Sequence, residues 1–281
     1  METRELRYFV AVAEELHFGR AAERLGIAQP PLSRAIQRLE RRLGVELLHR
    51  DNRSVELTAA GAVLLAEGRA ALDAVEAAGR RTRRAGTGTG SAALVLVTKA
   101  GASGELLAKL LDAYAAEPGA VEIDVQLCGI GEQEGMLRDG RADVALLYLP
   151  FDSATGFDTE VLRSEGQIAV LPAGHPLSLE TSLRTSDVTG LPGLPPPRWP
   201  RRDGTYPDGP GPKVRDHTQL LQLIMLGRTT AIMPESLRNQ LGEKLVAVPV
   251  VDAPKVTTVI AWPPHSRSRA LARLVEVATR L

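Results

Sequence analysis

The residues best suited to chemistry lie in one stretch near the N-terminus, Gln29–Glu40. Apolar side chains recur there at intervals of four, three and four residues (Leu32, Ile36, Leu39, Leu43), as on one face of an α-helix. The opposite face carries Ser33, Arg34, Gln37, Arg38 and Arg41. Arginine can form two hydrogen bonds with guanine, glutamine can do so with adenine, and serine can bind a base or a phosphate. The stretch predicts a helix that reads a DNA major groove; a solvated surface helix is the alternative.

The residues before this stretch supply the scaffold that such a helix needs. Periodic apolar residues predict helices over 4–16 and 20–25, and Gly26 suits the following turn because glycine tolerates positive φ. Pro30 and Pro31 suit the start of the third helix, where N–H groups lack partners anyway. Helix, tight turn and helix together predict a helix-turn-helix.

Two short β-like runs follow, Val45–Arg50 and Ser54–Leu57, around Asp51-Asn52-Arg53. Aspartate and asparagine favour a turn, so these runs predict a two-stranded wing with Arg53 at or near its tip. Thr58 can cap the helix expected next.

The stretch 59–84 is alanine-rich and repeats Leu65, Leu72 and Gly79 at seven-residue intervals, with Val75 between them. This pattern predicts a helix with a packing seam. Its length exceeds what three small helices can cover, so we expect it to make a dimer; the alternative is a helix that lies on its own domain. Glycine alternates with threonine or serine over 86–91, which predicts a flexible linker and a domain boundary.

After the linker, strands alternate with helices. Elements are expected at 93–98, 105–116, 121–127, 132–138, 144–149, 160–164, 167–171, 216–226, 230–233, 245–248, 257–262 and from about 267, with a further helix start at 234–236. The opening βαβαβ run predicts a parallel sheet with helices on its faces. Residues 190–213 are rich in proline and glycine, which predicts a long irregular loop that is either functional or disordered.

Two strand-to-helix junctions, Lys99–Gly104 and Cys128–Gly131, are expected at the carboxyl ends of adjacent strands. Ligands of open α/β sheets bind at such ends, and the unpaired N–H groups of helix N-termini suit anions. Lys99 adds a positive charge. Arg198, Trp199, Arg201 and Arg202 lie on the 190–213 loop, which could close over the same cleft. We therefore expect an anionic ligand there; ordinary polar loops are the alternative.

No catalytic or metal-binding constellation is evident in the sequence. Gly129–Gly135 resembles a dinucleotide-binding turn, but its third glycine is one residue late, and Glu132 and Glu134 would repel a pyrophosphate. Gly101–Gly104 resembles a nucleophile elbow, but Glu105 replaces the final glycine. The five histidines lack metal or triad spacing. We expect no enzymatic activity, no cofactor and no metal.

Length and composition agree with two domains. A chain of 281 residues with 44% hydrophobic residues can bury two sizeable cores. It has no apolar run long enough for a membrane span, and its first residues lack an apolar stretch, so we expect no secretory signal. Its single cysteine, Cys128, excludes an internal disulfide framework and fits a reducing cytoplasm. The net charge is zero, but residues 1–86 hold 15 arginines, no lysine and 12 acidic residues, a modest basic excess.

The first 60 residues closely resemble the LysR-type transcriptional regulators. The matching residues are Leu6-Arg-Tyr-Phe9, Phe18, Ala21-Ala22, Leu25, Ala28–Arg34, Ile36, Leu39-Glu40, Leu43-Gly44, Leu47-Leu48, Arg50, Leu57-Thr58 and Ala60-Gly61. Weaker landmarks recur at Leu137, Gly140, Asp143–Ala145, His175–Leu177 and Met233–Ser236. One departure is Gly19, where the family usually places the serine or threonine that caps the second helix. Another is the 190–213 loop, which is longer and richer in proline than expected.

The resemblance implies an α/β fold with a winged helix-turn-helix DNA-binding domain over 1–58, a linker and dimerisation helix over 59–86 and a flexible linker over 87–91. Residues 92–281 are then a two-lobed effector-binding domain resembling periplasmic binding proteins. We expect lobe I over 92–162 and 266–281, lobe II over 163–265, and a hinge near 162–166 and 262–266.

The function implied is that of a bacterial, cytoplasmic transcription regulator. We expect DNA contacts at Gln29, Pro30, Pro31, Ser33, Arg34, Gln37, Arg38 and Arg53. Effector contacts are expected at Lys99, Ala100, Gly101, Ser103, Cys128, Gly129, Leu149, Arg198 and Trp199. The expected partners are promoter DNA with an inverted repeat, a small-molecule effector and further copies in homodimers that pair into homotetramers. RNA polymerase is a further candidate partner, and no membrane is expected.

Two other classes of protein are less consistent with the sequence. A solute-binding protein would carry a signal peptide and no helix-turn-helix. An enzyme that had acquired a DNA-binding domain would carry a catalytic cluster.

Overall fold

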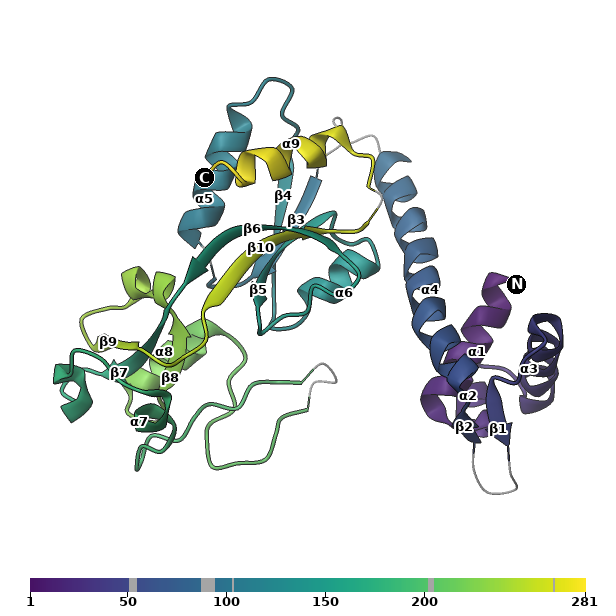
Figure 1. Ribbon diagram of the computed structural model, residues 1–281, viewed down its shortest axis with the longest axis horizontal. Helices are drawn as coiled ribbons and strands as arrows, with labels where there is room; N and C mark the ends of the chain where they lie inside the picture. The colour runs from purple at the N-terminus through teal and green to yellow at the C-terminus, as the bar shows by residue number, and fades with distance from the viewer. Residues whose placement is uncertain (51–54, 87–93, 103, 202–204, 265) are drawn as a thin grey trace. The chain divides into compact units, whose positions relative to one another are not determined.

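A computed structural model describes residues 1–50, 55–86, 94–102, 104–201, 205–264 and 266–281. The chain divides into two compact units, one formed mainly by Met1–Thr87 and the other by most of the remaining chain (Figure 1). Each unit is described by itself. No helix in the described ranges combines the length and apolar character that crossing a membrane requires.

The first unit is a winged helix-turn-helix. It contains α1 (Thr3–Glu15), α2 (Phe18–Arg24), α3 (Gln29–Leu43), an antiparallel pair β1 (Leu48–Arg50) and β2 (Val55–Leu57), and α4 (Ala59–Gly86). The apolar faces of the first three helices meet in one core, in which Phe9, Leu32, Ile36 and Leu39 are fully buried. The helix-turn-helix prediction is therefore confirmed. Arg53 and the rest of the 51–54 turn lie outside the described residues.

Local hydrogen bonds explain how these elements begin and where they meet. α2 starts at Phe18, two residues earlier than predicted, because Nδ1 of His17 accepts the N–H of Arg20 at 3.2 Å and caps the helix without a hydroxyl at Gly19. Thr58 caps α4 as predicted, since its Oγ1 accepts the Gly61 N–H at 2.9 Å. Glu40 Oε1 accepts the N–H groups of Leu47 at 3.0 Å and Leu48 at 3.2 Å, so α3 holds the first strand of the wing.

Two leucines of the seven-residue repeat of α4 make contacts within their own unit. Leu65 and Leu72 pack against the core of their own unit, and Arg69 pairs with Glu14 of α1 at 2.8 Å. These contacts hold α4 against α1 within the first unit. The opposite face of the helix is exposed along Ala59, Val63, Ala66, Ala70 and Ala74.

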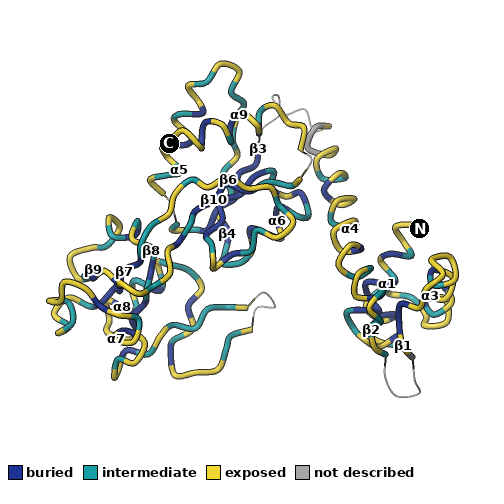
Figure 2. The backbone as a smooth tube through the Cα atoms, viewed as in Figure 1, coloured by how far each residue is buried: buried dark blue, intermediate teal, exposed yellow. Residues whose placement is uncertain are grey.

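Lobe I of the second unit is a five-stranded sheet with the order β4-β3-β5-β10-β6. Its strands are β3 (Leu94–Lys99), β4 (Ile123–Cys128), β5 (Val144–Leu149), β6 (Asp158–Glu165) and β10 (Val256–Trp262). The predicted parallel βαβαβ run is confirmed for β4, β3 and β5, whereas β10 is antiparallel to both β5 and β6. Figure 2 shows the central strands buried and β6 largely exposed at the edge.

Helices cover both faces of this sheet. α5 (Gly104–Ala115) and α9 (Arg269–Ala278) pack over one face through Leu110, Tyr114, Leu271 and Leu274. α6 (Gln133–Arg138) packs over the other face. Alternate residues of each central strand enter the two cores, as expected for a sheet buried on both sides.

Lobe II is a three-stranded antiparallel sheet with the order β8-β7-β9. It contains β7 (Gln167–Pro172), β8 (Ala231–Pro234) and β9 (Leu245–Val250), with α7 (Thr185–Thr189), α8 (His217–Met225) and the 3₁₀ turns η1 (Pro176–Leu179) and η2 (Glu235–Gln240). η1 and α7 were absent from the prediction because each is too short for a periodic apolar pattern.

The chain crosses between the lobes twice. The first crossing is at Gly166 between β6 and β7, within the segment 162–166. The second lies between Val250 and Val256, so the predicted crossing near 262–266 is wrong. The error arose because β10 was assigned to lobe II, whereas it pairs with β5 and β6 of lobe I. Lobe II therefore ends before residue 256 and not at 265.

The 190–213 segment is irregular, as predicted, but it is internally bonded. The Arg198 guanidinium donates to the carbonyl oxygens of Gly211 at 2.6 Å and Pro207 at 3.2 Å. A Cβ at Gly211 would lie 1.8 Å from the Pro196 carbonyl oxygen, so the two limbs of the loop require glycine to approach this closely. Residues 202–204, with Arg202, lie outside the described residues.

Candidate nucleic-acid interface and ligand cavity

The predicted DNA-reading residues share the solvent face of α3. Gln29, Pro30, Pro31, Arg34, Gln37 and Arg38 are exposed and Ser33 is half-buried. Arg34 Nε reaches only the Pro30 carbonyl of its own helix, at 3.4 Å. Within the described ranges, the side chains of Gln37 and Arg38 have no hydrogen-bond or ion-pair partner. These donors therefore remain available to an external acceptor.

The core fixes the direction of this face. Leu32, Ala35, Ile36 and Leu39 are buried on the opposite side of α3. Among the described residues no side chain caps α3, and prolines occupy its first turn, so the positive N-terminal end of this helix can accept an anion such as phosphate. An exposed face of arginine and glutamine on an uncapped helix is suited to DNA bases and phosphates.

The second unit contains a cavity of about 290 Å³ between its two lobes. Lobe I contributes residues from the ends of β3 and β5 and from neighbouring loops, and lobe II contributes residues from α8, β8, η2 and the 190–213 loop. The lining residues are Lys99, Ala102, Ile130, Tyr148 and Phe151 from lobe I, and Trp199, His217, Leu220, Ala231, Ile232, Met233, Pro234, Ser236 and Leu237 from lobe II. A small, mostly apolar cavity with a few polar groups is typical of a small-molecule site.

Lys99 at the cavity wall is part of a buried ion pair. Its Nζ lies 2.7 Å from Oδ1 of Asp152, and both residues are buried. Oδ2 of Asp152 accepts the Tyr148 N–H at 2.8 Å, and the Lys99 ammonium lies 5.1 Å from the centre of the Tyr148 ring. The expectation of an uncompensated positive charge at Lys99 is therefore corrected, because Asp152 neutralises it.

His217 connects the two lobes at the same cavity. Its Nδ1 lies 3.1 Å from the Ala100 carbonyl oxygen, and its ring lies 5.9 Å from the Trp199 ring. Burial is the main cause of the lowered pKa of His217, and the Lys99 charge adds to it, although the Ala100 hydrogen bond and Asp216 oppose the shift. The imidazole is therefore neutral near pH 7. Since a carbonyl oxygen only accepts, Nδ1 carries the hydrogen and Nε2 is left as an acceptor.

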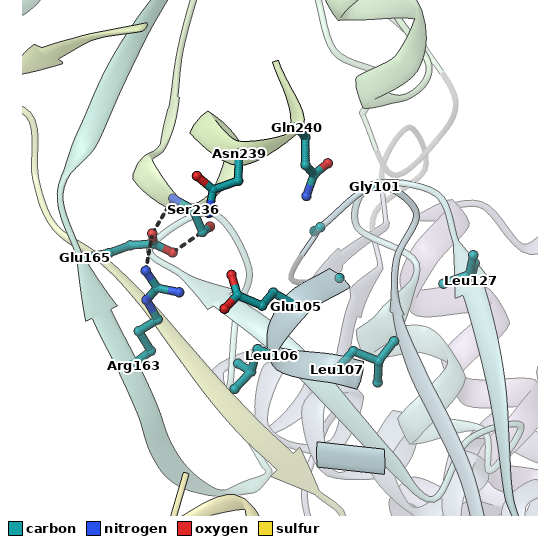
Figure 3. Close-up of a pocket in the computed structure, with 12 residues that line it drawn as sticks. Gly101, Glu105, Leu106, Leu107, Leu127, Arg163, Glu165, Ser236, Asn239 and Gln240 are labelled. Carbon is teal, nitrogen blue, oxygen red and sulfur yellow. Dashed lines mark hydrogen bonds and ion pairs between the residues drawn. The ribbon is translucent and has the colours of Figure 1, made fainter. Parts of the chain in front are cut away.

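A second cavity of about 490 Å³ shares Ser236 and Ala102 with the first (Figure 3). Its floor includes Leu106 and Leu107 of α5. Glu165, just before the Gly166 crossing, accepts the Ser236 N–H at 2.6 Å and its hydroxyl at 3.0 Å. The edge strand of lobe I thereby holds the start of η2, which forms one wall of both cavities.

The structure disperses several of the predicted effector residues. Lys99 and Trp199 line the inter-lobe cavity, and Gly101 lines the second cavity. Ala100 lines neither cavity, but its carbonyl oxygen accepts the hydrogen bond of His217, which lines the inter-lobe cavity. Cys128, Gly129, Leu149 and Arg198 line neither of these two cavities, and Ser103 lies outside the described residues. The Gly129 N–H is already bound by Glu132 Oε2 at 2.8 Å, so it is not open to an anion.

The prediction omitted Tyr148, Phe151, His217, Met233 and Ser236, all of which line the inter-lobe cavity. One signal was present in the sequence. Tyr148 and Met233 stand at the ends of predicted strands, where ligands of open sheets bind. His217 offered no comparable signal, because its contact with Ala100 depends on how the lobes meet.

Cys128 is expected to be chemically inert in the folded protein. Burial raises the pKa of its thiol to about 12, and the negative charge of Glu132 adds to the shift. Because the thiolate is the reactive form, iodoacetamide should alkylate the native protein at pH 8 roughly a thousandfold more slowly than the urea-unfolded chain. Mass spectrometry after timed quenching measures both rates, and similar rates would contradict the buried assignment.

No group of three or more His, Cys, Asp or Glu side chains in the described part of the chain is arranged to hold a metal ion. His217, which lines the cavity, has a lowered pKa, and its hydrogen bond among the described residues is to the Ala100 backbone carbonyl.

Comparisons with known proteins agree with this architecture. Residues 3–62 match the bacterial regulatory helix-turn-helix proteins of the LysR family, and residues 88–281 match the LysR substrate binding domain. The transcriptional regulator YnfL of Escherichia coli is 33% identical, over 97% of this chain and 96% of its own. BudR of Raoultella terrigena is 32% identical, over 99% of this chain and 100% of its own.

A solved structure of a full-length regulator on DNA also matches. CbnR in complex with its target DNA is 26% identical, with a TM-score of 0.52, over 100% of this chain and 99% of CbnR. The chain therefore belongs to the LysR family, and it is a DNA-binding transcriptional regulator under small-molecule control rather than an enzyme.

Proposed function

We propose that two copies of this chain read an inverted repeat in promoter DNA, each with one α3 in a major groove, and that a small molecule in the inter-lobe cavity alters this binding. The observation that carries the proposal is the exposed face of α3, whose Gln37 and Arg38 side chains are unengaged within the described ranges. The regulator would act in the cytoplasm, as a dimer that pairs into a tetramer, with RNA polymerase as a further partner.

The DNA contacts proposed are Gln29, Pro30, Pro31, Ser33, Arg34, Gln37 and Arg38 on α3, with Arg53 from the wing. The first two turns of α3 carry both the open helix end and the first base-reading side chains. Recognition helices of this class contact bases mainly through their N-terminal residues. Sequencing of genomic fragments retained by the purified chain tests the proposal. Enrichment of a common inverted repeat supports it, and a set of fragments without any shared motif would contradict it.

Arg34→Ala is expected to weaken binding to the selected DNA by about 1–3 kcal/mol, since it removes a two-pronged base contact. Fluorescence anisotropy at fixed salt measures the change. Arg4→Ala is the matched control, because Arg4 is exposed on α1 and its loss changes the net charge equally. Equal affinities of Arg34→Ala and the parent would exclude Arg34 from the interface.

The dimer is proposed to form through the exposed face of α4. Ala59, Val63, Ala66, Ala70 and Ala74 lie along one stripe, on the side away from α1. Small apolar side chains let two helix backbones approach closely over a long contact. Leu72, which the sequence placed in the dimer seam, already packs inside its own unit.

The effector is proposed to bind in the cavity between the lobes. Its walls come from both lobes, so a ligand that contacts both would favour one relative arrangement of them. The crossings at Gly166 and near 251–255 are the segments that would bend. Of the predicted effector residues, Lys99 and Trp199 remain in the proposed site.

A further inference from the structure

The inter-lobe cavity is electrically balanced. Within the described part of the chain, Lys99 is the one lining residue with a full charge. Its ammonium lies 2.7 Å from the Asp152 carboxylate, and both side chains are buried. Water screens such a pair little, so the two charges cancel at the cavity wall and offer little net attraction to an ion.

Asp152 is held too firmly to give way to a ligand anion. One of its carboxylate oxygens binds Lys99, and the other accepts the Tyr148 N–H at 2.8 Å. A ligand carboxylate that replaced Asp152 at Lys99 would leave a second carboxylate buried without its cation. An uncompensated buried charge is strongly unfavourable, so this exchange works against an anionic ligand.

The polar groups at the cavity can still bind a neutral ligand. Nζ of Lys99 has three N–H groups, so it can still donate to a neutral oxygen while it binds Asp152. His217 offers Nε2 as an acceptor, because its Nδ1 donates to Ala100. The Ser236 hydroxyl donates to Glu165 and can accept a further hydrogen bond. Each of these groups can bind a hydroxyl or amide of a ligand.

Tyr148 adds a hydroxyl, which lies 3.0 Å from Thr98 Oγ1, and the rest of the lining is apolar or aromatic, with Phe151 and Trp199 on opposite lobes. We infer that the effector is an uncharged molecule with an apolar or aromatic body and one neutral oxygen or amide group, in place of the anion that the sequence predicts. This inference rests on the proposed inter-lobe site and adds the charge class of its ligand.

Four probes of similar size test the inference on the full chain: benzyl alcohol, benzamide, benzoate and benzylammonium. Dissociation constants come from ligand-observed NMR titrations. The two neutral probes should bind at least about tenfold more tightly than either ion, since each ion would be buried without a counter-charge. Preferred binding of benzoate or benzylammonium by the parent would overturn the inference.

Asp152→Asn is the sharpest variant. It removes the negative charge but keeps a side-chain oxygen for the Tyr148 N–H, so Lys99 becomes unbalanced. The ratio of benzoate to benzamide affinity should rise by about tenfold or more. An unchanged ratio in a folded variant would contradict the inference. If thermal unfolding shows that this variant does not fold, the ranking of probes on the parent decides the matter.

Ile130→Trp tests whether the probes bind in the inter-lobe cavity, separately from whether that cavity prefers uncharged ligands. Ile130 lines the inter-lobe cavity but not the second cavity, and a larger side chain there would fill the space. Loss of probe binding in this variant places the probes in the cavity. Binding that persists in it, or binding of none of the probes to the parent, would overturn the proposed effector site and this inference with it.

Discussion

Replacing Lys99 with alanine is expected to destabilise the second unit by about 3–5 kcal/mol. The substitution leaves the Asp152 carboxylate buried, with the Tyr148 N–H but without the ammonium that lay 2.7 Å away. A loss of this size is a large part of the 5–15 kcal/mol that typically stabilises a folded domain.

Urea unfolding at pH 7 measures this effect in the correct part of the chain. Trp199 and Trp262 are the only tryptophans, and both belong to the second unit, so their fluorescence reports on it alone. Lys99→Met is the control for lost packing, since it keeps most of the side-chain volume and removes the charge. It should be nearly as unstable as Lys99→Ala.

The double variant Lys99→Met with Asp152→Asn should recover most of the lost stability, to within about 1–2 kcal/mol of the parent, because it removes both charges. Recovery on this scale is the signature of a coupled pair. If Lys99→Ala costs less than about 1 kcal/mol, or if the double variant is less stable than both single ones, the buried pair does not exist in solution.

The ion pair of Lys99 and Asp152 was only half predictable from the sequence. The position of Lys99 at the end of a buried strand was predictable, because a run of apolar residues ends there and glycines follow. Its partner was not, since Asp152 follows a different strand and reaches Lys99 only because β3 and β5 lie side by side. A charge assigned from one strand alone therefore missed the carboxylate that pairs with it.

The difference between local and long-range information also explains why the first unit was predicted more accurately than the second. The helices of the first unit were predicted well because each carries its own apolar stripe, and Gly26, Gly44 and Thr58 mark the ends of three of them. The lobe boundary after β9 was missed because strand partners are set by pairing across the sheet. β10 follows β9 in sequence, but it pairs with β5 and β6 of lobe I.

Periodicity located α4 but could not say which of its faces meets which partner. The leucine repeat was the strongest pattern in the helix, and it proved to contact the helix's own unit. The weaker stripe of alanines on the other side is the face left exposed. In an alanine-rich helix, a pattern of apolar residues identifies packing faces without identifying what packs there.

Ala70→Glu is therefore expected to give a monomer. Ala70 lies in the middle of the exposed stripe, between Ala66 and Ala74, so a glutamate there would place a charge between two closely packed helices. Two readers joined in one dimer can bind about 10²–10⁴ times more tightly than one reader alone. The variant should lose affinity for the inverted repeat by a factor in this range.

Ala71→Glu is the matched control for this change. Ala71 is also exposed, but one residue turns the helix by about 100°, which moves the new charge off the stripe. Light scattering should therefore show a monomer for Ala70→Glu and the parental oligomer for Ala71→Glu, with DNA affinity following the oligomeric state. If Ala70→Glu keeps the parental oligomer, the chains associate elsewhere, and the exposed face of α4 is only a solvated surface.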